Sequence, residues 1–299
     1  MQSLLRHRSL TAALAALLTL AGSESVWAQP RVPALPSITA IQCSFEGGGR
    51  FSGPGDLSPT WASAREMARQ VADRVPDAAI AGVQGLDSRE AAGKLRELLS
   101  ESTRGPWLHA WTGQGRQGSP DGLALFWRSD RVTLERDLGK APIDFLDDGT
   151  VLHVIGGWFR QVATGRTFGF FTARLASPHE RRGAMPVSRT TQRWEAWRVR
   201  EFVWESMIPH PDDARILAID LESSFGSSAW FELRKDFEPD GDKRFTVDSS
   251  AALFHGKRYD FLFWDGHAGP RFPGGVLGKP GRSEHFGSAH RFVWAALKL

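Results

Sequence analysis

The chain has 299 residues and a mass of 33.0 kDa, with 41% hydrophobic and 24% charged residues. This composition excludes a wholly disordered chain, and the length allows one large domain or two small ones. The single cysteine, Cys43, excludes an intramolecular disulfide and a zinc site built on cysteines. The formal net charge of +3 is too small to indicate nucleic-acid or membrane binding by bulk charge.

The N-terminal segment has the pattern of a secretory signal. Arg6 and Arg8 precede an apolar stretch from Leu10 to Ala21, which is shorter than the ~20 residues of a membrane-spanning helix. Small residues then lead to Ala28, after which cleavage is expected. We therefore expect residues 1–28 to be a signal peptide and the protein to be secreted or periplasmic. An uncleaved membrane anchor is the alternative; no later segment is long and apolar enough to span.

The rest of the chain predicts one α/β domain. Residues 29–37 are expected to form a lead-in, and residues 38–299 show no break in composition that would indicate a linker. Short apolar runs predict strands at 38–45, 78–86, 122–127, 151–159, 168–175, 216–221, 259–264 and 291–297. Helical periodicity predicts helices at 58–75, 87–99 and 188–207, and Gly/Pro-rich loops at 112–121, 176–187, 236–243 and 265–287.

Two of these helices carry further signals. Asp87 and Glu90 have the spacing of a capping box at the start of the second helix. The third helix has one apolar face, made of Ala196, Val199, Val203 and Met207. Its remaining tryptophans, Trp194, Trp197 and Trp204, predict that this helix is largely covered.

Eight segments occur in an order that resembles a known family. They include ITAIQCSF (38–45), PDAAIAGVQGL (76–86), TGRTFGFFTARL (164–175), ILAIDLES (216–223), the strand Tyr259 to Phe263 and SAHRFVWAAL (288–297). This series is similar to the endonuclease/exonuclease/phosphatase superfamily, the fold of pancreatic deoxyribonuclease. The resemblance implies a four-layer α/β sandwich, with two mostly antiparallel sheets face to face and helices outside. It also implies a site for metal-dependent phosphoester hydrolysis at one end of the sandwich.

The resemblance places the family's polar site positions on particular residues. Asp220 and His290 keep the family's residue, and so does Gln84 beside the site. The other positions are substituted: Ser44 and Thr172 stand where the family has Asn, Gly85 where it has Glu, Arg174 where it has His, Glu222 where it has Asn, and Ala289 where it has Asp.

These substitutions predict impaired chemistry. Gly85 lacks the carboxylate that would carry most of the metal affinity, and Ala289 lacks the acceptor expected to orient His290. Arg174 adds a permanent cation, which we expect to pair with Asp220 or Glu222 in place of a metal. The sequence thus favours a catalytically impaired or non-catalytic protein with a binding or scaffold role and no cofactor.

Two alternatives stay open. Glu46, Asp220 and Glu222 could rebuild a Mg²⁺ or Mn²⁺ site that works with His290 as a metal-dependent phosphoesterase. Ser283-Glu284-His285 also imitates the family's Ser-Asp-His motif, but the strand pattern that follows His290 favours Ser288-Ala289-His290. No partner is identified; a phosphate-containing ligand is compatible with the site, nothing indicates nucleic acid strongly, and we expect a monomer.

The signal pattern gives a direct prediction. Mass spectrometry of the exported protein should find an N-terminus near Gln29, because the charged, apolar and small-residue regions end at Ala28. Mature protein that still begins at Met1 would contradict this.

Overall fold

The computed structural model describes most of the chain beyond the predicted signal peptide. The described residues are 37–45, 59–86, 88–112, 122–147, 149–177, 181–182, 185–186, 188–240, 246, 259–265, 281–284, 286, 288 and 290–299. All of them belong to one of the two units into which the chain divides, Pro36–Leu299. The predicted signal peptide and residues 29–36 of the lead-in lie outside the described residues. None of the helices in the described part combines the length and the apolarity that crossing a membrane requires.

The first sheet has six strands in the order β13-β14-β1-β2-β4-β3. Its strands are β1 (Ser37–Ser44), β2 (Ala78–Leu86), β3 (Trp107–Thr112), β4 (Gly122–Arg128), β13 (Gly281–Arg282) and β14 (Val293–Lys298). Only β1 and β2 are parallel; the other neighbours are antiparallel.

The second sheet also has six strands, in the order β11-β12-β10-β7-β6-β5. Its strands are β5 (Val132–Phe145), β6 (Val151–Gln161), β7 (Thr167–Arg174), β10 (Ala214–Asp220), β11 (Glu238–Pro239) and β12 (Asp260–Trp264). Here β7 and β10 form the one parallel pair. A separate two-stranded sheet consists of β8 (Arg181–Arg182) and β9 (Met185–Pro186).

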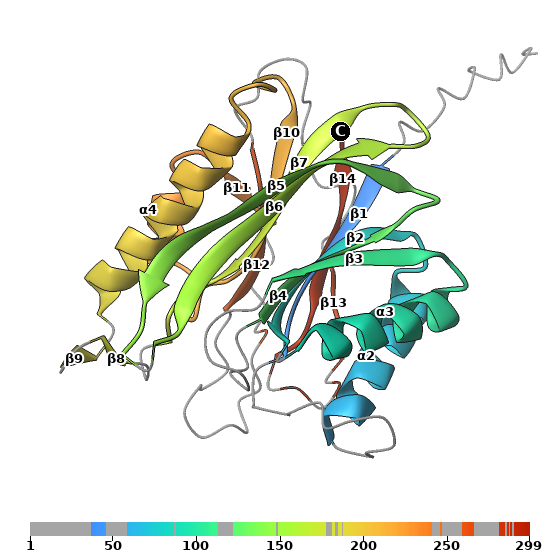
Figure 1. The fold of residues 1–299 in the computed structure, drawn as a ribbon, viewed down its shortest axis with the longest axis horizontal. Helices are drawn as coiled ribbons and strands as arrows, with labels where there is room; N and C mark the ends of the chain where they lie inside the picture. The colour runs from blue at the N-terminus through green and yellow to red at the C-terminus, as the bar shows by residue number, and fades with distance from the viewer. Residues whose placement is uncertain are drawn as a thin grey trace, which may run out of the picture. The chain divides into compact units, whose positions relative to one another are not determined.

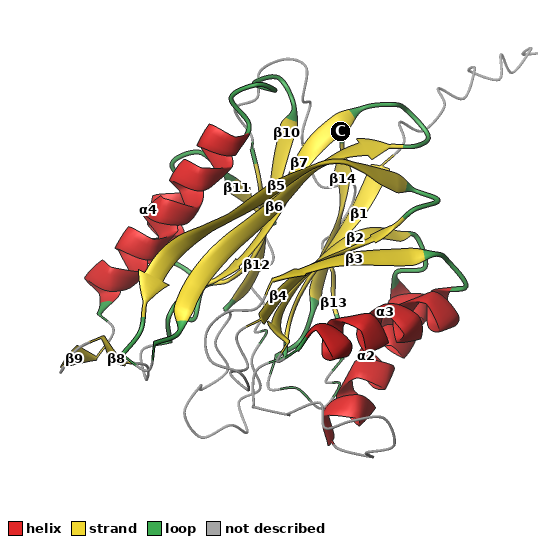
Figure 2. Ribbon diagram, viewed as in Figure 1, coloured by secondary structure: helices red, strands yellow, loops and turns green. Residues whose placement is uncertain are grey.

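Helices cover the outer faces of the two large sheets. The helices α2 (Pro59–Arg74) and α3 (Arg89–Thr103) lie against the first sheet, and α4 (Arg189–Ser206) and α5 (Ser228–Leu233) against the second. Figure 2 shows the resulting order of layers, with α4 on one side of the paired sheets and α2 and α3 on the other. The expected four-layer sandwich of mostly antiparallel sheets is confirmed.

Three apolar clusters hold these layers together. One lies between the sheets and contains the inward-facing residues of both, such as Ile80 of β2 and Phe170 of β7. A second joins the first sheet to α2 and α3, and a third joins the second sheet to α4 and α5. Alternate residues of β1 fall into the first two clusters, because successive side chains of a strand point to opposite faces.

The expected elements appear with small shifts at their ends. All eight predicted strands and all three predicted helices are present. The cap of α3 is Ser88, whose side chain accepts a hydrogen bond from the Ala91 N–H; the predicted cap, Asp87, lies outside the described residues. The expectation that α4 is largely covered was wrong: Trp194 and Trp204 are 48% and 36% exposed. The guanidinium of Arg215 instead stacks on Trp204, with Cζ of Arg215 at 3.9 Å from the centroid of the Trp204 ring.

Several elements were not expected from the sequence. The long strand β5 lacks an apolar run because most of its residues are exposed or half-buried. The edge strand β3 is short, and α5 has only six residues. The two-residue strands β8, β9, β11 and β13 occur within segments predicted to be loops.

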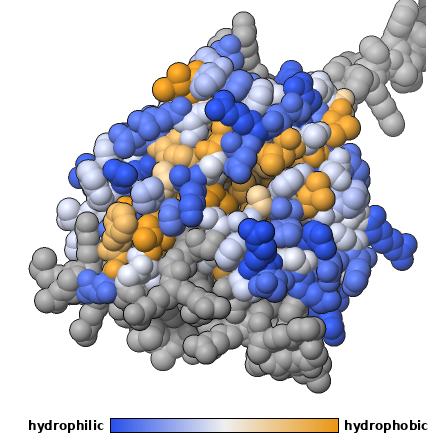
Figure 3. Space-filling model, in the orientation of Figure 1, coloured by the Kyte–Doolittle hydropathy of each residue, from blue (hydrophilic) through white to orange (hydrophobic). Residues whose placement is uncertain are grey.

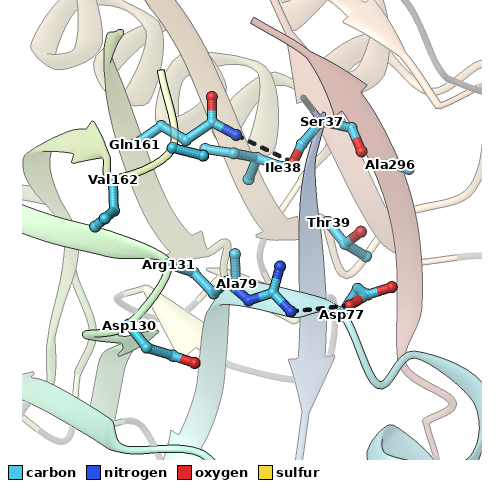
Figure 4. Close-up of a pocket in the computed structure, with 11 residues that line it drawn as sticks. Ser37, Ile38, Thr39, Asp77, Ala79, Asp130, Arg131, Gln161, Val162 and Ala296 are labelled. Atoms are coloured by element: carbon cyan, nitrogen blue, oxygen red, sulfur yellow. Dashed lines mark hydrogen bonds and ion pairs between the residues drawn. The ribbon is translucent and has the colours of Figure 1, made fainter. Parts of the chain in front are cut away.

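A cavity of about 570 Å³ lies where β1 begins. Its walls include Asp77, Arg131, Gln161 and Ser37 (Figure 4). Arg131 donates a hydrogen bond to Asp77 over 3.1 Å, and the Gln161 side chain donates one to the Ser37 carbonyl over 3.2 Å. The cavity is therefore at the opposite end of β1 from Ser44, where the sequence predicts the functional site.

Two glycines provide a test of the packing. An added Cβ at Gly82 of β2 would lie 2.7 Å from Ala218 Cβ and 2.8 Å from Thr172 Oγ1, so Gly82→Ala should destabilise the protein by about 1–3 kcal/mol. The matched variant Gly93→Ala, on α3, meets no atom within 4 Å and should stabilise it by about 1 kcal/mol. Urea unfolding checks both; equal midpoints for the two variants would refute the close approach of the sheets at Gly82.

Candidate functional site

Three charged residues form a row across the second sheet. Arg174 ends β7, Asp220 ends β10 and Asp260 begins β12. The strand register pairs Asp220 with Arg174 on one side and with Asp260 on the other. Like charges directly opposite one another destabilise a sheet, so the two aspartates require a compensating group.

The imidazole of His290 lies close to both aspartates. Its Nδ1 lies 2.9 Å from Asp260 Oδ2 and 3.8 Å from Asp220 Oδ2. The backbone N–H of His290 donates to Ser288 Oγ, and Ser288 in turn donates to the Ser44 carbonyl, both within about 3.1 Å. The imidazole is thereby held against Asp260 in a fixed orientation.

The first sheet reaches the same cluster through two glutamines. Gln42 of β1 donates from Nε2 to Asp260 Oδ1 over 2.8 Å and to Gln84 Oε1 over 3.0 Å. Gln84 of β2 donates to Thr172 Oγ1 over 2.6 Å. These amides link the facing sheets by hydrogen bonds where the apolar core between them ends.

The second charged contact joins Arg174 and Glu222. Both Nε and Nη2 of Arg174 donate to Glu222 Oε1, at 3.1 and 2.9 Å. Glu222 has a φ of 48°, in the left-handed region, and its N–H donates to Asp220 Oδ1. The sequence predicted an ion pair of Arg174 with Asp220 or Glu222, and the structure contains the pair with Glu222. Asp220 accepts a hydrogen bond from the backbone of the turn that positions this glutamate.

The helix α4 binds the backbone on both sides of this pair. Gln192 donates from Nε2 to the carbonyls of Ala176 and Glu222, and Glu195 accepts the N–H of Ala176. Gln192 and Glu195 are buried residues on the inner face of α4. The segment after β7 and the turn after β10 are thus attached to one helix.

Gly85 differs from the glutamate that the resemblance implies in its backbone conformation as well as in its side chain. It has a φ of +78° at an irregularity in the pairing of β2 with β4. A Cβ there would lie 2.9 Å from the Phe45 carbonyl oxygen. A glutamate at this position would meet both an unfavourable backbone conformation and a clash with main chain, so the backbone itself excludes the family's carboxylate.

The cluster is buried as well as charged. Asp220, Glu222, Asp260 and His290 have no exposed surface, and Arg174 is 7% exposed. Burial raises the pKa of the neighbouring Cys43 thiol well above its usual value, and the negative charge of Asp260 adds to this rise. The side chains of Asp220 and His290 are therefore not exposed at the surface.

The remaining predicted residues lie as follows. Ser44 and Thr172 are buried at the same end of the sandwich. Glu284 is exposed and pairs with Arg74 at the end of α2, away from His290. Glu46, Ala289 and His285 lie outside the described residues.

One sequence interpretation was wrong. We expected the carboxylate that orients His290 to be lost at position 289, but Asp260 provides it. Asp260 and Gln42 were both missed as site residues. The signal for each was a polar residue inside an otherwise apolar strand, in YDFLFW and ITAIQCSF.

A divalent metal fits this site poorly. Asp220, Asp260 and His290 could bind a metal, since one ligand atom of each lies within 4.8 Å of the others. Mg²⁺, however, prefers six oxygen ligands in near-octahedral geometry. Both Asp260 oxygens already contact Gln42 and His290, Gly85 offers no carboxylate, and the guanidinium of Arg174 contacts Glu222 Oε1.

Comparison with solved structures identifies the architecture (Figure 1). An endonuclease/exonuclease/phosphatase from Bacteroides vulgatus is similar with a TM-score of 0.64 and 16% identity, over 88% of this chain and 99% of that one. The fold is that of the endonuclease/exonuclease/phosphatase structures. A mannosyl-6-phosphatase from Bacteroides thetaiotaomicron gives a TM-score of 0.60 at 17% identity, over 88% and 100% of the two chains. TDP2 from D. rerio gives 0.63 at 12%, over 88% and 99%.

At the sequence level, no family model and no curated protein matches this chain. The resemblance stated from the motifs is confirmed for the endonuclease/exonuclease/phosphatase fold. The activities of the similar structures belong to those proteins.

The buried ion pair gives a stability prediction. Arg174→Met should lower the free energy of unfolding by about 3–5 kcal/mol, because it leaves Glu222 charged and buried without its guanidinium. The double variant Arg174→Met/Glu222→Leu should recover part of that loss. Urea unfolding of the single and double variants measures this; an Arg174→Met midpoint equal to that of the wild type would contradict it.

Proposed function

We propose that the protein is an exported, non-catalytic member of the endonuclease/exonuclease/phosphatase fold with a binding or scaffold role. The charged N-terminal region, the short apolar stretch and the small residues before Ala28 support export. The end of the sandwich that would hold a metal site acts, in this proposal, as a structural tie between the two sheets and α4.

One observation carries the proposal. The Arg174–Glu222 ion pair places a permanent cation inside the polar cluster, where an active enzyme of this kind needs a divalent metal. A guanidinium can bind a phosphate by hydrogen bonds, but it does not coordinate and activate a water as a divalent metal does, and Arg stays protonated at every physiological pH. The backbone at Gly85 and the complete burial of Asp220 and His290 point the same way.

A second candidate is a phosphoesterase with an altered site. The contact between His290 and Asp260 favours it, because a carboxylate that binds one ring nitrogen of a histidine orients the other nitrogen toward a metal. In this reading Asp220, Asp260 and His290 would hold Mg²⁺ or Mn²⁺, a donor set different from the Glu46, Asp220 and Glu222 considered from the sequence.

Activity measurements separate the two readings. We expect no metal-dependent turnover of phosphomonoesters, phosphodiesters or sugar phosphates with added Mg²⁺ or Mn²⁺. Asp220→Ala should lower the melting temperature, because it removes a buried acceptor of the Glu222 N–H at a cost of about 1–3 kcal/mol. The matched variant Asp73→Ala removes an exposed carboxylate and should leave the melting temperature nearly unchanged.

The decisive contrary result is a robust Mg²⁺-dependent hydrolysis rate that Asp220→Ala abolishes and Asp73→Ala leaves intact. That outcome would make the protein an enzyme. A stabilising shift in melting temperature on adding Mn²⁺, absent from Asp220→Ala, would likewise favour the metal-binding reading.

A further inference from the structure

The sheet edges of this protein are protected unequally. The edge strand β5 carries charged residues such as Glu135, Arg136 and Lys140, and three irregularities interrupt its pairing with β6. The edges β11 and β13 have two residues each. The edge strand β3, WLHAWT, has no charged residue and pairs with β4 over six consecutive positions without irregularity. Charged side chains, bulges and short length are the usual protection of an edge strand against pairing with another chain. The strand β3 has neither charged side chains nor a bulge.

The direction of the free backbone groups of β3 follows from its pairing. Trp107 is opposite Arg128, and the Ser129 N–H donates to the Pro106 carbonyl. In an antiparallel ladder, a hydrogen bond between the residues that flank a pair marks that pair as non-hydrogen-bonded. The backbone N–H and C=O of Trp107 therefore point away from β4. The same holds at every second residue, and the N–H and C=O of His109 and Trp111 therefore point outward. Among the described residues they have no backbone partner.

We propose that the β3 edge is a self-association site, at which β3 of a second copy pairs antiparallel with the first about a twofold axis through Ala110. This replaces the monomer expected from the sequence. The result is one sheet that continues from one copy into the other.

The register follows from two constraints. Residues that pair across the interface must have their side chains on the same face of the joined sheet. A residue of one copy can therefore pair only with a residue of the other copy whose number differs from its own by an even number. An axis at His109 would require the Trp107 N–H, which already donates to Ser100 Oγ over 3.2 Å. With the axis at Ala110, His109 of each copy is opposite Trp111 of the other. Only the outward N–H and C=O groups of these two residues are needed, and they form four backbone hydrogen bonds.

The side chains suit this register. Ala110 meets Ala110, His109 meets Trp111, and Leu108 meets Thr112, so no charge faces a like charge. Burial lowers the pKa of His109, and the nearby Arg96 and Arg89 lower it further, which keeps the imidazole neutral at pH 7. Leu108 is 44% exposed and would be covered. On the face in view in Figure 3, hydrophobic side chains reach the surface in the area where Figure 1 places β3, β4, β5 and β6.

Sedimentation velocity of the mature protein, from micromolar to near-millimolar concentration, tests the proposal. A strand pair of this size makes a small interface, so we expect a reversible dimer that forms as the concentration rises. His109→Pro removes an outward N–H and leaves the bonds to β4 intact, so it should abolish dimerisation while the protein stays folded by circular dichroism. A wild type that stays monomeric throughout, or a His109→Pro variant that still dimerises, would overturn it.

A pair of charge variants tests the register. Leu108→Lys/Thr112→Lys places like charges opposite each other at both ends of the interface and should abolish dimerisation. Leu108→Lys/Thr112→Glu places opposite charges there and should restore it. Equal behaviour of the two variants would refute the axis at Ala110. None of these residues belongs to the polar cluster, so the result is independent of whether the protein has catalytic activity.

Discussion

The polar cluster at one end of the sandwich depends on the balance of buried charge. Asp220, Glu222 and Asp260 bring three fully buried carboxylates to one end of the sandwich. Repulsion between such groups is strong in a medium of low polarity, and only a positive or proton-bearing partner makes their burial tolerable. Arg174 serves Glu222 and His290 serves Asp260. Arg174 is therefore the cation on which the burial of Glu222 depends.

This charge balance also explains how the layers stay in register. The apolar cluster between the sheets has no direction, because dispersion and burial of apolar area tolerate sliding. The hydrogen bonds of Gln42 and Gln84 do have direction, and they cross from the first sheet to Asp260 and Thr172 of the second. Gln192 of α4 extends the same network to the outer layer. A small set of polar contacts thus adds directional bonds to the close packing of the core.

The sequence predicted the layers better than the site. Apolar runs located every central strand, because a strand buried on both faces consists of consecutive apolar residues. The edge strand β5 escaped because its exposed residues carry charges and its pairing is irregular. At the site, Arg174 and Glu222 were recognisable as partners because each lies two residues from another site position along its strand or turn. Asp260 was not, because it stands alone at the start of an apolar strand, and only the pairing of β10 with β12 brings it beside Asp220.

Gly85 has a consequence for any attempt to place a carboxylate at the end of β2. Exchanging Arg174 alters one side chain and its ion pair with Glu222. Position 85 is different, since its left-handed backbone and its approach to the Phe45 carbonyl belong to the path of the main chain. A designer would first have to straighten the end of β2 and reset its pairing with β4 before any carboxylate could be placed there. Any side chain at position 85 therefore depends on the path of the main chain at the end of β2 as well as on its own chemistry.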